Sequence, residues 1–117
     1  MLHLSSSCRY YLYRHATDMR KGIDSLCGIV TNELQLNILS GSVFIFINKN
    51  HNQIKLLLWE GDGFSVYYKR LEKGTYEMPE TAINEQVINI SNELLQHILQ
   101  GVFLQSIRKR KRYQQTA

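Results

Sequence analysis

The sequence predicts an α+β fold: an antiparallel β-meander sheet with one amphipathic helix packed on a face and a short C-terminal helix. Three observations lead to this prediction. Apolar residues recur at helical spacing between residues 19 and 34, three strand-like segments then follow one another directly, and a second helical period begins after Ser91. With 117 residues, 44% of them hydrophobic, the chain can build one modest core. We therefore expect a single α+β domain over residues 1–104, followed by a basic, disordered tail over 105–117.

The first elements expected are a strand and a helix. Residues 9–14 are rich in aromatic side chains and suit a strand. Asp18 is a residue type that caps helices, and the residues after it predict a helix. The expected inward face of this helix consists of Met19, Ile23, Leu26, Cys27, Val30 and Leu34.

Three strands are expected next, over residues 42–48, 53–60 and 64–70, joined by two hairpin loops. A four-residue first loop pairs Val43 with Leu58, Ile45 with Leu56 and Ile47 with Ile54. A three-residue second loop, with Gly63 at positive φ, pairs Leu58 with Val66 and Leu56 with Tyr68. Together these registers predict one apolar face that the first helix covers, formed by Val43, Ile45, Ile47, Ile54, Leu56, Leu58, Val66 and Tyr68.

The opposite face of this sheet is unusually aromatic for a solvent face. Its expected members are Phe44, Phe46, Lys55, Leu57, Trp59, Ser65, Tyr67 and Lys69. Either another element covers this face, such as the N-terminal strand or the C-terminal helix, or the face binds a partner or a second copy of the chain. In the second case the interaction surface consists of Phe44, Phe46, Leu57, Trp59 and Tyr67.

The C-terminal part is expected to contain one more strand and one helix. A short extended stretch is predicted near residues 75–78, and a strand over 87–90. Ser91 is expected to cap a helix whose inward side chains are Leu94, Leu95, Ile98, Leu99 and Val102.

Several functional classes find no support in the sequence. The longest apolar runs fall far short of the ~20 residues of a membrane-spanning helix, and the N-terminus lacks the pattern of a signal peptide. We therefore expect a cytoplasmic protein without a membrane partner. The two cysteines and four histidines are not spaced as metal ligands, so we assign no metal and no cofactor.

The sequence also predicts no catalytic residue, and hence no enzyme. No serine or cysteine stands in a nucleophile motif, and the three aspartates are all explained by capping, turn or surface positions. A metal-dependent nuclease using Asp18, Asp24, Glu60 or Asp62 is a third, less favoured alternative.

Positive charge is concentrated in one run near the C-terminus, formed by Arg108, Lys109, Arg110, Lys111 and Arg112. Outside this run the chain has nine basic against 10 acidic residues. The run can neutralise phosphates in a sequence-independent, salt-sensitive manner, or it can be a solvated tail. Within the domain, Lys55 and Lys69 beside Trp59 and Tyr67 could form a stacking platform for single-stranded nucleic acid.

Five stretches, taken in order, resemble the TnpB accessory proteins of the insertion-sequence sixty-six family, which are distinct from the RNA-guided nucleases of the same name. These are residues 10–14, 18–28, 39–46, 54–57 and 59–76, within a resemblance that covers about residues 4–79. Two sites depart from the family pattern. His15-Ala16 stand where Gly-Pro is frequent, and 49–53 stand where a cluster of arginines is frequent.

The resemblance implies a bacterial mobile-element protein, encoded beside a separate transposase and assisting DNA transposition without performing strand transfer. It implies two partners, the element's DNA and the transposase, and it leaves a homodimer open. The stretches that match most closely, 18–22 and 68–74, make five cations candidate nucleic-acid contacts: Arg20, Lys21, Lys69, Arg70 and Lys73. The alternative is a protein-protein interaction module that dimerises or docks on the transposase without binding DNA directly.

Overall fold

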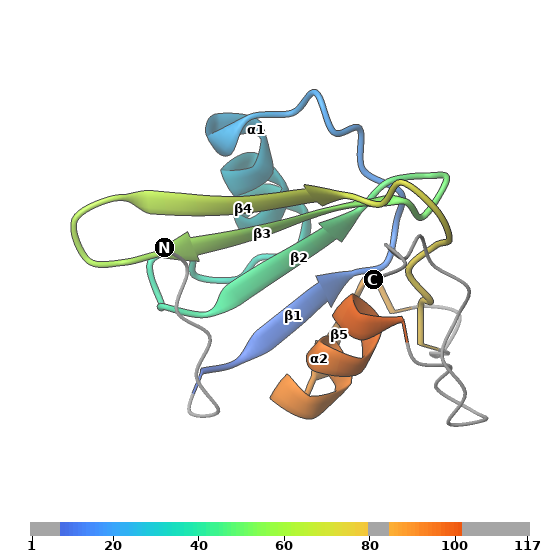
Figure 1. Cartoon of the computed structure of the whole chain (residues 1–117). Coiled ribbons are helices and arrows are strands. Elements are labelled where there is room, and N and C mark those ends of the chain that lie inside the picture. Colours follow the sequence, from blue (N-terminus) through green and yellow to red (C-terminus); the bar gives the residue numbers. More distant parts are fainter. Residues whose placement is uncertain (1–7, 80–84, 102–117) are drawn as a thin grey trace.

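The computed structural model describes residues 8–79 and 85–101, which form a five-stranded sheet with a helix on each face (Figure 1). Along the chain the elements are β1 (Tyr10–Tyr13), α1 (Ile23–Gly28), the π-helical turn η1 (Ile29–Glu33), β2 (Val43–Ile47), β3 (Gln53–Trp59), β4 (Phe64–Arg70), β5 (Val87–Ile90) and α2 (Asn92–Gln100). The strand order is β4-β3-β2-β1-β5. The α+β class is confirmed, with a mixed sheet in which only β1 and β2 run parallel.

The register of the first hairpin is confirmed. Val43 pairs with Leu58, Ile45 with Leu56 and Ile47 with Ile54. The side chain of Asn48 stabilises the four-residue loop, because its Oδ1 accepts the backbone N–H groups of Asn52 (3.0 Å) and Gln53 (2.9 Å). Asparagine side chains commonly bond to the backbone of their own turn, and here these two bonds hold the loop in its conformation.

The register of the second hairpin differs from the prediction by one residue. Leu58 pairs with Ser65 and Leu57 with Val66, because the loop has four residues and is closed by the bond from Glu60 N–H to the carbonyl of Gly63 (2.9 Å). The left-handed conformation falls on Gly61, with φ of 96°, and not on Gly63. A one-residue slip exchanges the faces of the whole strand. The side chains that therefore join the face predicted to be aromatic are those of Phe64, Val66, Tyr68 and Arg70.

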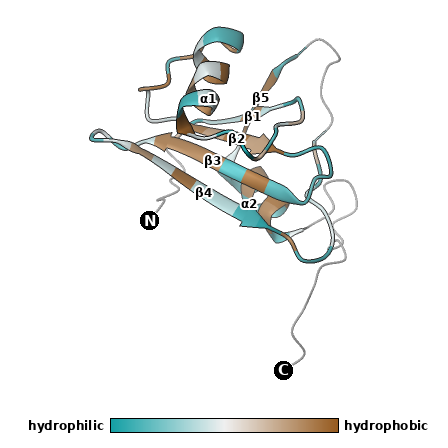
Figure 2. Ribbon diagram, turned by 90° about the horizontal axis from the view of Figure 1, so that it is seen from above, coloured by the Kyte–Doolittle hydropathy of each residue, from teal (hydrophilic) through white to brown (hydrophobic). Residues whose placement is uncertain are grey.

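Two apolar clusters lie on the two faces of the sheet, each beneath a different helix (Figure 2). The face with Val43, Ile45 and Leu56 packs against α2, through Leu95 and Ile98. The opposite face, with Phe44 and the side chains near it, packs against α1 and η1 through Leu26, Ile29 and Val30. The expectation that the first helix covers the Val43 face is wrong.

The first helical segment is shorter than the periodicity predicts. Residues 19–22 are not helical, α1 begins at Ile23, and its N-cap is Gly22, which has no side-chain capping bond. Asp18 does not cap this helix. After Gly28 the chain continues as the π-helical turn η1, ending near Leu34. The inward positions Leu26, Ile29 and Val30 are buried on the sheet, so packing stabilises a segment of weak intrinsic propensity.

The C-terminal elements agree with the sequence. The strand β5 occupies the predicted residues and pairs antiparallel with β1. The Oγ of Ser91 accepts the backbone N–H of Leu94 (3.1 Å), which is the predicted N-cap. Residues 75–78 form no strand, although Tyr76 is buried and its N–H donates to the carbonyl of His51 (2.6 Å). The predicted inward residue Val102 and the tail 105–117 lie outside the described residues.

Candidate nucleic-acid interface

The segment between β1 and α1 is anchored to the end of β2. The backbone N–H of Thr17 donates to the carbonyl of Ile47 (2.9 Å), and Thr17 itself is buried. This bond holds residues 16–20 beside the loop that joins β2 to β3, although the two segments are about thirty residues apart in the sequence. The chain thereby brings together side chains that no local pattern links.

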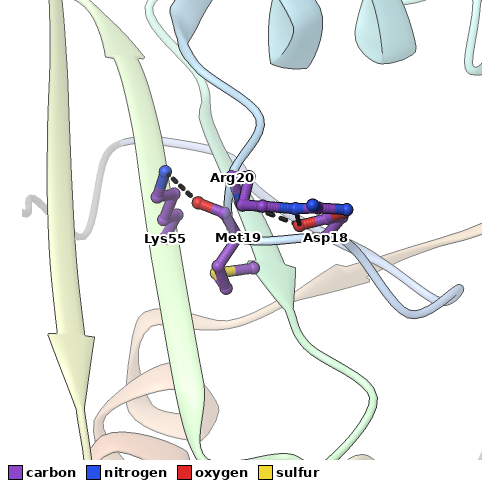
Figure 3. A network of polar contacts seen from close by, with 4 residues as sticks. All are labelled: Asp18, Met19, Arg20 and Lys55. Carbon is purple, nitrogen blue, oxygen red and sulfur yellow. Dashed lines mark hydrogen bonds and ion pairs between the residues drawn. The ribbon is translucent and has the colours of Figure 1, made fainter.

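Asp18 and Arg20 form a bidentate ion pair within this segment (Figure 3). Nε of Arg20 lies 3.0 Å from Oδ1 of Asp18, and Nη2 lies 2.6 Å from Oδ2. The backbone N–H of Arg20 also donates to Oδ1 (2.9 Å). These bonds, first the one from the side chain of Arg20, lower the pKa of the Asp18 carboxyl from 3.8 to about 2. The carboxylate that was expected to cap α1 instead orients the guanidinium of Arg20.

Lys55 ties the sheet to the same segment. Its Nζ donates to the backbone carbonyls of Met19 (Figure 3) and Lys21, both at 2.9 Å, and lies 5.5 Å from the ring centre of Tyr68. The ammonium group is thus already engaged by two carbonyls and a ring within the chain. Lys55 acts as a structural anchor for the segment rather than as an open cation.

A basic groove opens between these parts. It is lined by residues 16–20, by residues 48–50 of the loop after β2, and by Gln53 and Tyr68 of the sheet. Its volume of about 630 Å³ lies in the range of small-molecule sites. Arg20 and Lys49, both exposed, bring two positive charges to the groove, against the single negative charge of Asp18. The groove can therefore accept an anionic group, with the half-exposed ring of Tyr68 offering a stacking surface.

The remaining predicted cations occupy several places. Lys21 is exposed next to the groove wall, and Arg70 lies opposite Gln53 in the β3–β4 pairing. Arg70 also approaches Glu72 at 3.8 Å, a weak exposed pair. Lys69 is paired with Ile54, on the other face of the sheet, and Lys73 is exposed beyond the end of β4. The run at positions 108–112 lies outside the described residues.

The predicted interaction surface is divided by the fold. Phe44, Phe46 and Leu57 are buried beneath α1 and η1, so the chain itself covers this part of the aromatic face. Trp59 is half-buried and its ring lies 4.9 Å from that of Phe64. Tyr67 is exposed, but the register places it on the other face, opposite Leu56.

Sequence reasoning missed two groove residues, Lys49 and Tyr68, as parts of the site. The hairpin pattern places Lys49 only in a loop, and it places Tyr68 on the core face. The loop of Lys49 stands where arginines are frequent in the resembled family, which is a signal for it, whereas no local pattern marks Tyr68. The exposure of Tyr68 could have been inferred from a four-residue second hairpin loop.

The described residues contain no group of three or more histidine, cysteine, aspartate or glutamate side chains that could hold a metal ion. Among the same residues, no helix is both long and apolar enough to cross a membrane.

Comparison with known proteins gives a family and two relatives. The model of the family described as IS66 Orf2 like protein matches residues 8–109, which includes the first two residues of the basic run. A protein of Sinorhizobium fredii named y4hO, itself uncharacterised, is 31% identical over 102 residues, covering 87% of each chain. A second uncharacterised protein of this organism, y4jC, is 24% identical over 87% of this chain and 86% of its own. No solved structure matches this chain.

Proposed function

Because this chain belongs to the IS66 Orf2-like family and is thus a transposition-related accessory protein, we propose that it acts without catalysis by binding the element's DNA at the basic groove. The observation that carries this proposal is the junction of residues 16–20 with residues 48–50, which places Arg20 and Lys49 beside the exposed ring of Tyr68. Cations bind phosphate, and an aromatic ring stacks on a base that is not held in a duplex.

The geometry of Arg20 supports phosphate binding. Asp18 receives the bonds of Nε and of one N–H of Nη2, and no other described residue takes the N–H groups of Nη1 or the second one of Nη2. The carboxylate also fixes the plane of the guanidinium, which lowers the entropy lost when an oxyanion binds. Lys21 and Arg70 flank the groove and extend the positive surface.

The test is a salt series of fluorescence anisotropy measurements with labelled terminal-repeat DNA, as single strands and as duplex. We expect Arg20→Gln with Lys49→Gln to weaken binding and to reduce the salt slope by about one for each lost phosphate contact. Arg9→Gln is the matched control, since Arg9 is an exposed arginine outside the groove. A second variant with Arg108, Lys109, Arg110, Lys111 and Arg112 replaced by glutamine separates the tail from the groove.

Two results contradict the proposal. One is the absence of binding at low salt in the wild-type chain and in the tail variant alike. The other is a loss of binding free energy for the groove double variant that is only twice the loss for the single variant Arg9→Gln, which would mean that only net charge matters.

A second candidate is a module that docks on the transposase of the same element without direct DNA binding. Its support is the exposure of Tyr67, a member of the predicted interaction surface that lies on the face opposite to Trp59 and is 39% exposed. Sedimentation of the chain with purified transposase tests this candidate, with Tyr67→Ala as the variant. If the two proteins sediment independently at micromolar concentration, this candidate is wrong.

A further inference from the structure

The strand β4 forms one edge of the sheet. Its inner side pairs along its full length with β3, and no described strand pairs with its outer side (Figure 1). At seven residues it is longer than β5, the four-residue strand at the other edge. An unpaired edge of this length is a template for pairing with another strand.

The hydrogen bonds at the two ends of the hairpin show which backbone groups point outward. Glu60 N–H donates to the carbonyl of Gly63, and Leu71 N–H donates to the carbonyl of Asn52. Hydrogen-bonded and non-hydrogen-bonded pairs alternate along an antiparallel ladder. Odd-numbered residues of β4 therefore bond to β3. The residues that direct N–H and C=O away from the sheet are Phe64, Val66, Tyr68 and Arg70.

The devices that commonly protect an edge are sparse in β4. The strand contains no proline, and its charged residues, Lys69 and Arg70, are both at its C-terminal end. The five residues before them are uncharged, and Tyr67 and Tyr68 are 39% and 48% exposed on opposite faces. Uncharged and aromatic side chains at an unpaired edge favour association.

The sequence of β4 is complementary to itself in one antiparallel register. With Tyr67 opposite Tyr67, Val66 lies opposite Tyr68, Ser65 opposite Lys69 and Phe64 opposite Arg70. The outward-facing residues then form the hydrogen-bonded pairs, and Tyr67 falls at a non-hydrogen-bonded pair, where side chains come closest. No like charges oppose each other, and Arg70 meets an aromatic ring. In this register all seven residues of the strand are paired, and no residue of the turns takes part.

We propose that two copies of this chain pair antiparallel through β4, centred on Tyr67, so that their sheets form one continuous sheet. The two-fold axis of such a pair is perpendicular to the sheet, so both α1 helices and both basic grooves lie on the same side. Dimerisation is a property separate from DNA binding and does not depend on it. Where DNA is also bound, this arrangement presents two grooves to one nucleic acid.

Opposite charges placed at position 65 test the register. Position 65 faces Lys69 of the partner copy in this register, so Ser65→Lys should weaken dimerisation and Ser65→Glu should strengthen it. The two substitutions disturb the monomer similarly, since both place a long charged side chain on the same face. We expect their dissociation constants in sedimentation equilibrium to differ by about tenfold at low salt, with a smaller difference at high salt. Adding Lys69→Glu to Ser65→Lys should restore dimerisation.

Oxidative crosslinking gives a second measurement that does not depend on charge. Tyr67→Cys should form a disulfide-linked dimer, because the two residues oppose each other at the axis. The wild-type chain, with Cys8 and Cys27, measures the background, and Leu39→Cys is the control for an exposed position outside β4. Val66→Cys and Tyr68→Cys should crosslink when mixed with each other, and less when each is alone.

Three outcomes overturn the proposal. The first is a monomer at every concentration up to the millimolar range. The second is a dimer whose dissociation constant is the same for Ser65→Lys and Ser65→Glu. The third is crosslinking of Tyr68→Cys or Val66→Cys alone in preference to Tyr67→Cys, which would mean another register. These measurements contain no DNA, so their failure leaves the proposal for the groove unaffected.

Discussion

Single residues before α1 decide the shape of the basic groove. Asp18 precedes a helical pattern and has a side chain suited to capping, yet its carboxylate binds the backbone N–H and guanidinium of Arg20. The local pair forms readily because the two residues are only two apart in the sequence. The segment is held to the sheet by other groups, the N–H of Thr17 and the ammonium of Lys55.

The pH dependence of Asp18 is a prediction at this scale. Its folded-state pKa, about 2, lies below the ordinary 3.8, so the bond to Arg20 contributes above pH 3.8 and is lost as the pH falls through about 2. An NMR titration of the Asp18 carboxyl carbon should have its midpoint near 2. Arg20→Gln should move the midpoint toward 3.8, and Arg9→Gln, at the opposite end of β2, should leave it in place. A wild-type midpoint at 3.8 contradicts the bidentate pair.

A second prediction concerns Lys55. Lys55→Met keeps an unbranched side chain but leaves the carbonyls of Met19 and Lys21 without their donor. We expect the free energy of unfolding to fall by about 1–3 kcal/mol in urea denaturation. Lys73→Met, at an exposed position, should change it by less than about 0.5 kcal/mol. Equal effects of the two substitutions would show that Lys55 does not anchor the segment.

At the scale of elements, loop length decides the two faces of β4. The segment Gly61-Asp62-Gly63 suits a three-residue loop and a four-residue loop alike, since both glycines permit positive φ. The chain uses four residues, so Val66 packs beside the cluster under α1 and Tyr68 reaches the groove. In the first hairpin the Asn48 side chain favours one loop length, and the register could be predicted.

The N-cap of α2 gives a prediction for an element. Ser91→Ala removes the acceptor of the Leu94 N–H and should lower the free energy of unfolding by about 1 kcal/mol. Ser91→Asp keeps an acceptor and should retain the stability of the wild-type chain. Thermal or urea denaturation measures both. If the Ser91→Ala and Ser91→Asp variants have the same free energy of unfolding, the cap has no role in stability.

At the scale of the whole molecule, one sheet separates two apolar clusters. The central strands are buried on both faces, which is why β2 has five buried residues in succession instead of an alternating pattern. The aromatic face that could have bound a partner is therefore largely the second half of the core. Only its outer positions, near β4, remain at the surface.

This division predicts how Leu57 responds to substitution. Leu57→Ala should lower the free energy of unfolding by about 2–5 kcal/mol, because it leaves a cavity beneath α1. Leu39→Ala, at a leucine that is 54% exposed, should cost less than about 0.5 kcal/mol. Chemical denaturation at a low protein concentration measures the free energy of unfolding of both variants. A small effect at Leu57 contradicts the covered face.

The sequence by itself determined the α+β class, the core strands, the first hairpin register and the Ser91 cap, because each follows from periodicity or from contacts between near neighbours. Tertiary structure decided which helix covers which face, the parallel pairing of β1 with β2, and the β4 register. It also decided the groove, where the predicted cation Arg20 meets Lys49 and Tyr68. The physical reason is that apolar alternation shows that a face is buried but not what buries it. The helices, strands and loops therefore adopt the packing that covers both faces of one sheet.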